Sequence, residues 1–256
     1  MPVNCYQQGR VSNIPGVLGR LGEIQQDIDQ NGPGHPDGIG CFNTLYTVIT
    51  KQVRDGVDKK VYRDNEFMAA LDVAFANRYL DALRKEDAAP GHAPGPWRVL
   101  IDKRADTAVA ELQFAAAGVN AHIDFDLAAA VLEVWEQGAP DSGPHNRDQH
   151  TTYQEIDAVF AREMTRLRHE FEDTDLRRFD AGRVTKFLSY ISDWTVNVTR
   201  DIAWGHASRM WHIRRLHADG AYMEGLDLLA TAIGEALLIP LVERAPGSPS
   251  KPPRAT

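Results

Sequence analysis

The chain has 256 residues, of which 43% are hydrophobic and 25% charged, and this balance is ordinary for a globular protein. Its formal net charge of −8 disfavours a nucleic-acid partner, because phosphate binding usually relies on clustered Lys and Arg. Cys5 and Cys41 lie far apart in the sequence and indicate neither a disulfide framework nor a Cys-based zinc site. We therefore expect a cytoplasmic protein.

No segment of the sequence predicts export or membrane insertion. The N-terminus lacks a basic stretch followed by an apolar run, and no window approaches the roughly 18 consecutive apolar residues of a membrane span. We expect neither a membrane nor a nucleic acid as a partner, and the sequence leaves the oligomeric state open.

Helical periodicity dominates the chain and predicts an all-α, single-domain bundle of about eight helices. Runs rich in Gly and Pro separate the periodic segments. We expect one helical domain over residues 1–243 and a disordered tail over 244–256, because that tail has nothing to bury. The expected helices, in chain order, are 16–30, 38–55, 65–86, 103–118, 120–137, 151–173, 182–218 and 221–243.

The segment 118–127 places four polar side chains in an otherwise apolar, Ala-rich stretch: Asn120, His122, Asp124 and Asp126. Such groups are costly to bury without partners. On a regular helix His122 and Asp126 share one face, where an imidazole beside a carboxylate can bind a metal or share a proton. Asn120 and Asp124 also share a face, which lies about 200° around that helix from the face of His122 and Asp126. Either the helix is interrupted and the four groups converge, or the two pairs serve different neighbours.

The spacing of His122 and Asp126 is weak evidence by itself. With nine histidines and 23 aspartates, about one His-x-x-x-Asp is expected by chance, and the chain has two. The setting is more informative, because the apolar residues on both sides of this pair face a core. The competing interpretation is structural: Asn120, Asp124 and Asp126 cap a helix end, while His122 satisfies a buried carbonyl.

A second polar stripe is predicted on the helix expected over 182–218. It carries Asp193, Arg200, Asp201 and Trp204 beside the apolar face of that helix. Aromatic walls with a few charged groups are typical of small-molecule cavities. The alternative is a boundary stripe in which the two acids pair with arginines.

Familiar catalytic motifs are missing from the sequence. It contains no Gly-x-Gly-x-x-Gly after a strand, no Walker loop and no Gly-x-Ser-x-Gly elbow. It also contains neither His-Glu-x-x-His nor the Glu-x-x-His ligands of di-iron bundles. We expect no redox cofactor. A divalent metal would need an unfamiliar set of ligands, and no metal-binding residue is assigned.

The run from Gly118 to Leu127 resembles the Gly-x-Asn-Ala-His-Ile-x-x-Asp-Leu hallmark of an uncharacterised, all-helical family common in actinobacteria. Three other stretches, 37–46, 71–79 and 200–204, are similar to that family as well. The resemblance covers most of the chain from about 15 to 240. The resemblance implies membership of that family, but it implies no activity, because the family has none assigned.

The chain is also remotely similar to the zinc-dependent phospholipase C and single-strand nuclease proteins, which use His-x-x-x-Asp pairs at a metal cluster. Only His122 and Asp126 fit that pattern, and no tryptophan ligand lies beside Met1. This likeness implies a metal-dependent phosphoesterase as one alternative function.

The leading hypothesis is a small-molecule enzyme that catalyses a proton-transfer reaction, namely hydrolysis, lysis or cyclisation, in an interior polar pocket. His122 would act as the general acid or base, with Asp126 or Asp201 orienting it. The substrate-binding residues would be Asn120, Asp124, Asp193, Arg200 and Trp204. The rival hypothesis is a non-catalytic helical scaffold or small-molecule carrier, whose buried polar groups hold the core in register.

Overall fold

The computed structural model describes residues 4–32, 37–138, 141–174, 182–184, 187 and 196–241. Every regular element within these ranges is helical, which confirms the predicted all-α class. The expected tail over 244–256 lies outside the described residues. In chain order the longer helices are α1 (Ile14–Asn31), α2 (Gly38–Asp58), α3 (Asn65–Ala88), α4 (Gly95–Lys103), α5 (Glu111–Asn120), a π-helical segment (Ala121–Asp126), α6 (Leu127–Gln137), α7 (Arg147–Glu155), α8 (Asp157–Thr174), α10 (Val196–Ile213) and α11 (Asp219–Leu237).

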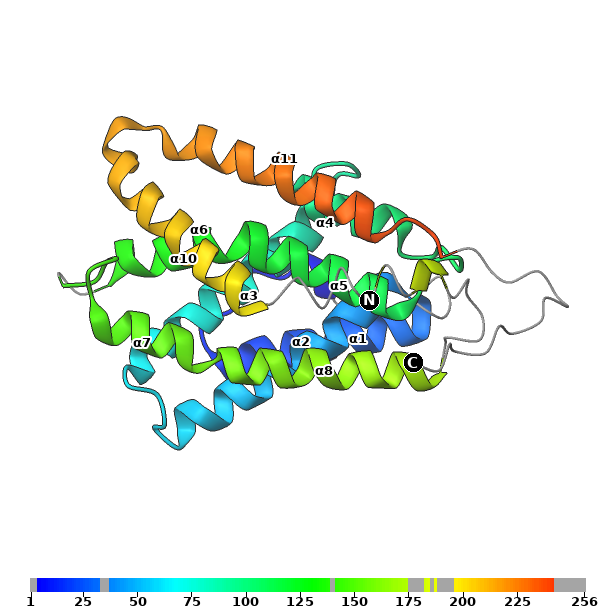
Figure 1. Cartoon of the computed structure of the whole chain (residues 1–256), viewed down its shortest axis with the longest axis horizontal. Helices are drawn as coiled ribbons and strands as arrows, with labels where there is room; N and C mark the ends of the chain where they lie inside the picture. Colours follow the sequence, from blue (N-terminus) through cyan, green and yellow to red (C-terminus); the bar gives the residue numbers. More distant parts are fainter. Residues whose placement is uncertain are drawn as a thin grey trace, which may run out of the picture.

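A central helical rod organises the bundle. It consists of α5, the π-helical segment and α6, which follow one another without a break. Helix α2 packs against α5, α3 packs against α6, and α10 and α11 cover the rod from another side (Figure 1). The π-helical segment contacts α3, α4, α10 and α11, and four of its six residues are buried: Ala121, His122, Ile123 and Asp126.

Polar side chains fix where several helices begin. Asn13 caps α1 by accepting a hydrogen bond from the backbone N–H of Gly16. Asp37 caps α2 through two backbone N–H groups, and Asp64 caps α3 through that of Phe67. Each cap satisfies donors that have no partner within the helix. These local signals explain why the expected starts of α2 and α3 agree with the structure.

Three expected helices were wrong at their boundaries. The helix expected over 103–118 begins only at Glu111, as α5, while Gly95 and Pro96 begin another helix, α4, in a stretch where no helix was expected. Proline is tolerated in the first helical turn, where its missing N–H is not needed. The helix expected over 151–173 is interrupted at Ile156, which separates α7 from α8. The helix expected over 221–243 ends at Leu237.

The central rod is the most apolar part of the described chain. By length and composition Glu111–Gln137 is the one candidate membrane span among the described residues, and 89% of its apolar window is buried inside the bundle. The core helix of a folded domain passes the same test, and neighbouring helices cover this one on several sides.

Candidate functional site

The polar segment singled out in the sequence coincides with a π-helical turn in the central rod. Residues Ala121–Asp126 form this turn, and the backbone N–H of Leu127 bonds to the carbonyl of His122, five residues back. A π-helical turn adds one residue to the helix and often occurs at functional sites. The helix is therefore irregular here.

The π-helical turn keeps His122 and Asp126 together. Nδ1 of His122 lies 3.2 Å from Oδ2 of Asp126. The same carboxylate oxygen accepts a hydrogen bond of 2.8 Å from the indole Nε1 of Trp97 in α4. His122 is 2% exposed and Asp126 is 3% exposed. The imidazole, the carboxylate and the indole thus form one buried chain of hydrogen bonds, which holds one ring nitrogen of His122 in place.

Aromatic rings from three helices surround His122. The ring of Phe75 stacks on the imidazole, with 3.4 Å between ring centroids and 7° between planes. The ring of Tyr46 meets its edge, with centroids 4.6 Å apart. The cage comprises Phe42 and Tyr46 of α2, Phe75 and Tyr79 of α3, and Trp97 of α4. The other ring nitrogen, Nε2, has no hydrogen-bond partner among the described residues.

Burial controls the protonation of this pair. It lowers the pKa of His122, and the hydrogen bond and charge of Asp126 oppose that shift only in part. Burial also raises the pKa of Asp126, against the opposing effects of His122 and Trp97. Burial therefore disfavours the charged form of the imidazole.

The other pair predicted from the sequence serves different neighbours. Asn120 is fully buried, and its Nδ2 donates to the carbonyl of Ala230 in α11 at 2.8 Å. Asp124 has one carboxylate oxygen without a partner among the described residues, and burial raises its pKa to about 7. Asn120 therefore ties the rod to α11. Neither side chain hydrogen-bonds to His122 or Asp126.

Arg200, predicted to hold a ligand, instead hydrogen-bonds to other residues of the protein. Its Nε lies 2.5 Å from Oδ1 of Asp157, and its Nη2 donates to the carbonyl of Tyr153 at 2.6 Å. The guanidinium also lies over the rings of Tyr153 and Phe160. With 2% exposure, Arg200 joins α10 to α7 and α8. This geometry supports the alternative interpretation, in which the stripe pairs its charges internally.

The remaining predicted residues of that stripe do not join His122 either. Trp204 packs against His150, Tyr153 and Trp135, and Asp201 is exposed on the surface of α10. Asp193 lies outside the described residues. Within the described part of the chain, no hydrogen bond or ring contact connects the His122 cage with Arg200, Asp201 or Trp204. The described residues therefore do not form a single pocket from both segments, and of the two acids predicted to orient His122, only Asp126 hydrogen-bonds to it.

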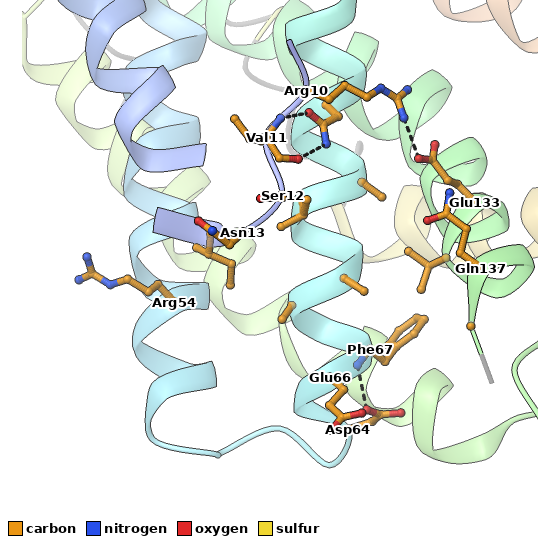
Figure 2. Close-up of a pocket in the computed structure, with 18 of the residues that line it drawn as sticks. Arg10, Val11, Ser12, Asn13, Arg54, Asp64, Glu66, Phe67, Glu133 and Gln137 are labelled. Atoms are coloured by element: carbon orange, nitrogen blue, oxygen red, sulfur yellow. Dashed lines mark hydrogen bonds and ion pairs between the residues drawn. The ribbon is translucent and has the colours of Figure 1, made fainter. Parts of the chain in front are cut away.

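A surface cleft lies elsewhere. It has a volume of about 860 Å³ and runs between the segment 10–15, α3 and α6 (Figure 2). Val11 and Asn77 exchange two hydrogen bonds at this cleft, and Arg10 reaches Glu133 across it. None of the residues predicted for the site lines this cleft, and no pattern in the sequence indicated it. On α3, Val73 and Asn77 line the cleft, whereas Phe75 and Tyr79 belong to the His122 cage on another face of the helix.

A comparison with known protein families identifies the family of this chain. A family model described as "Family of unknown function (DUF5995)" matches residues 14–240. The chain belongs to this family. Neither curated proteins nor solved structures give a match. The DUF5995 match covers every helix from α1 to α11 and names no activity.

Three further buried polar groups of this DUF5995 protein belong to α2 and α3, the helices that supply most of the His122 cage. The hydroxyls of Tyr46 and Thr50, and Oδ2 of Asp72, have no hydrogen-bond partner among the described residues. Burial raises the pKa of Asp72 to about 7.

A metal centre finds no support in the geometry of this DUF5995 protein. Across the described residues, no group of three or more His, Cys, Asp or Glu side chains is placed to hold a metal ion. His122 and Asp126 have Trp97 as their neighbour, and an indole N–H donates a hydrogen bond and offers no lone pair to a metal.

Proposed function

We propose that this DUF5995 protein is a small-molecule enzyme in which His122 transfers a proton as a general base or acid. One observation carries the proposal: Asp126 holds one ring nitrogen of His122, while the other has no partner within the described protein. A base oriented by a carboxylate, with its second nitrogen free, is the arrangement used in general acid–base catalysis.

The surroundings of His122 supply the other requirements of such a base. Burial lowers the pKa of His122, so the unprotonated form that accepts a proton predominates at neutral pH. The stacked ring of Phe75 and the hydrogen bond from Trp97 to Asp126 restrict the orientation of the imidazole. The reaction class is hydrolysis, lysis or cyclisation of a small molecule. Substrate entry requires the helices around the cage to open, because His122 is 2% exposed.

A direct test compares turnover by matched variants. Purified wild-type protein, His122→Asn and His206→Asn are each incubated with a small-molecule extract, and untargeted mass spectrometry follows the composition. Asparagine keeps a side-chain N–H near the position of Nδ1 and removes the free nitrogen. His206 is the control, because it lies in α10 and its Nδ1 contacts the hydroxyl of Tyr222 at 2.7 Å. We expect wild type and His206→Asn to convert the same compound and His122→Asn to leave it unchanged.

The second candidate function is a non-catalytic scaffold or carrier, and the full burial of His122 and Asp126 favours it. In that case the hydrogen-bonded chain only stabilises the core. His122→Asn would then lower the stability of the protein, and no compound would distinguish wild type from the variant. That outcome would overturn the enzyme proposal.

A further inference from the structure

Exposed apolar side chains gather along one helix of the described chain. Six large apolar residues among the described residues are more than half exposed, and three of them lie on α11 or directly after it: Leu228 at 72%, Leu229 at 58% and Ile239 at 57%. A fourth, Leu216, is 76% exposed in the turn that leads into this helix. Apolar residues gathered in one surface patch mark an interaction site, whereas single ones are ordinary.

Helix α11 lies at the edge of the bundle (Figure 1). One side of it packs on α4, α5 and the π-helical segment. That side is defined by the buried residues of the helix: Leu226, Ala230, Gly234 and Leu237. The opposite side, which we call the outer face of α11, carries Leu228 and is exposed along the whole helix.

The outer face has the residue spacing of a helix-packing seam. Its central residues are four, three, four and three positions apart: Ala221, Gly225, Leu228, Ala232 and Glu235, all of them exposed. This alternation is the spacing with which two helices pack side by side. A Cβ atom at Gly225 would meet nothing within 4 Å, so the surface is open there. Small residues at such a seam let a second helix approach closely.

The seam is complementary to itself when two copies of α11 run antiparallel. With a two-fold axis at the level of Ala230, Leu228 of one copy faces Ala232 of the other, and Glu235 faces Gly225. Each long side chain then meets a small one, as close packing requires. In a two-fold dimer every such contact occurs twice, because the same surface patch is used on both copies.

Charge favours the same antiparallel arrangement. Helix α11 contains no Lys, Arg or His and has four acids: Asp219, Glu224, Asp227 and Glu235. The turn before it is basic and includes Arg215, which is exposed. Antiparallel helices bring the basic turn of each copy towards the end of α11 that carries Glu235 in the other. Parallel helices would instead set acids against acids and the basic turns against each other.

We propose that two copies of this chain associate through the outer face of α11, with the two α11 helices antiparallel about a two-fold axis. The partner is a second copy because the seam residues complement one another in size, and because the acids of α11 find their opposite charges in the basic turn of the same chain. The dimer buries Leu228, the most exposed apolar side chain of α11. This inference does not depend on the proposed function.

The test is the mass of the purified full chain by sedimentation equilibrium. We expect twice the 28.5 kDa of one chain. Leu228→Lys places a charge in the seam and should raise the dissociation constant of the dimer at least about thirtyfold, the effect of a hot-spot residue. Val61→Lys is the matched control, since Val61 is 62% exposed outside α11, and it should leave the constant unchanged. A monomeric wild type, or a Leu228→Lys variant that dimerises as tightly as wild type, would overturn the proposal.

An exchange of charges tests the antiparallel orientation. Glu235→Arg and Arg215→Glu should each weaken the dimer by about fivefold at low ionic strength, because each variant sets like charges against each other at both ends of the seam. Mixing the two variants should restore the affinity of wild type, since opposite charges then meet at both ends. A mixture that associates no more tightly than either variant alone would overturn the antiparallel dimer.

Discussion

Asp72→Asn probes how strongly the core opposes a buried negative charge. The substitution keeps the size and hydrogen-bonding shape of the side chain and removes its ability to ionise. Asp72 is 7% exposed in α3, and burial raises its pKa from the ordinary value of an aspartate to about 7. The folded protein therefore holds this proton more tightly than the unfolded chain does.

The sign of the pH dependence follows from this difference. A group whose pKa is raised by folding gives its full stability below the unfolded value, near pH 4, and loses it as the pH rises through about 7. The shift of about three pKa units corresponds to about 4 kcal/mol in total. Most of the loss falls between pH 5 and pH 8, where wild type should lose about 3 kcal/mol more than Asp72→Asn.

Urea unfolding at pH 5, 6, 7 and 8 measures this difference. The free energies of unfolding of wild type and Asp72→Asn should diverge as the pH rises, with the variant more stable at pH 8. Asp58→Asn, at an exposed position on α2, controls for the loss of one negative charge. Parallel pH profiles for wild type and Asp72→Asn would refute the reasoning, because they would mean that Asp72 ionises equally easily in both states.

Two substitutions elsewhere test the packing around the site. Gly118→Ala should lower the melting temperature, because its Cβ would lie 2.5 Å from the ring of Phe42 in the His122 cage, whereas Gly19→Ala meets nothing within 4 Å and should stabilise helix α1 by up to about 1 kcal/mol. Thermal unfolding of the pair checks this, and equal effects would contradict it. Arg200→Met should cost about 3–5 kcal/mol in urea unfolding, because it leaves the carboxylate of Asp157 without its partner. A loss below about 1 kcal/mol would contradict this structural role of Arg200.

The parts of the site that depend on local geometry could be predicted from the sequence. His122 and Asp126 are four residues apart, and a helical backbone brings such side chains together whatever else the fold does. The pair indeed forms a hydrogen-bonded contact. For Asn120 the sequence left two alternatives open, and the structure shows that it has a different neighbour, the carbonyl of Ala230.

The parts that depend on distant contacts could not be predicted. Trp97 reaches Asp126 only because α4 begins at Gly95, inside a run read as a loop. Arg200 was assigned to a ligand because nothing in the sequence marks Asp157 and Tyr153 as its partners; that pairing depends on how α10 packs against α7 and α8. Tertiary packing brings these partners together, and a single sequence does not show which helices pack against one another.

The state of the His122 ring is the most direct test of the central claim, because a general base needs a free nitrogen. A ¹⁵N spectrum of the histidine side chains at pH 7, with His122 assigned through His122→Asn, measures it. We predict a neutral imidazole with its proton on Nδ1, facing Asp126, and an unprotonated Nε2. A proton on Nε2, or a charged imidazolium, would contradict the account.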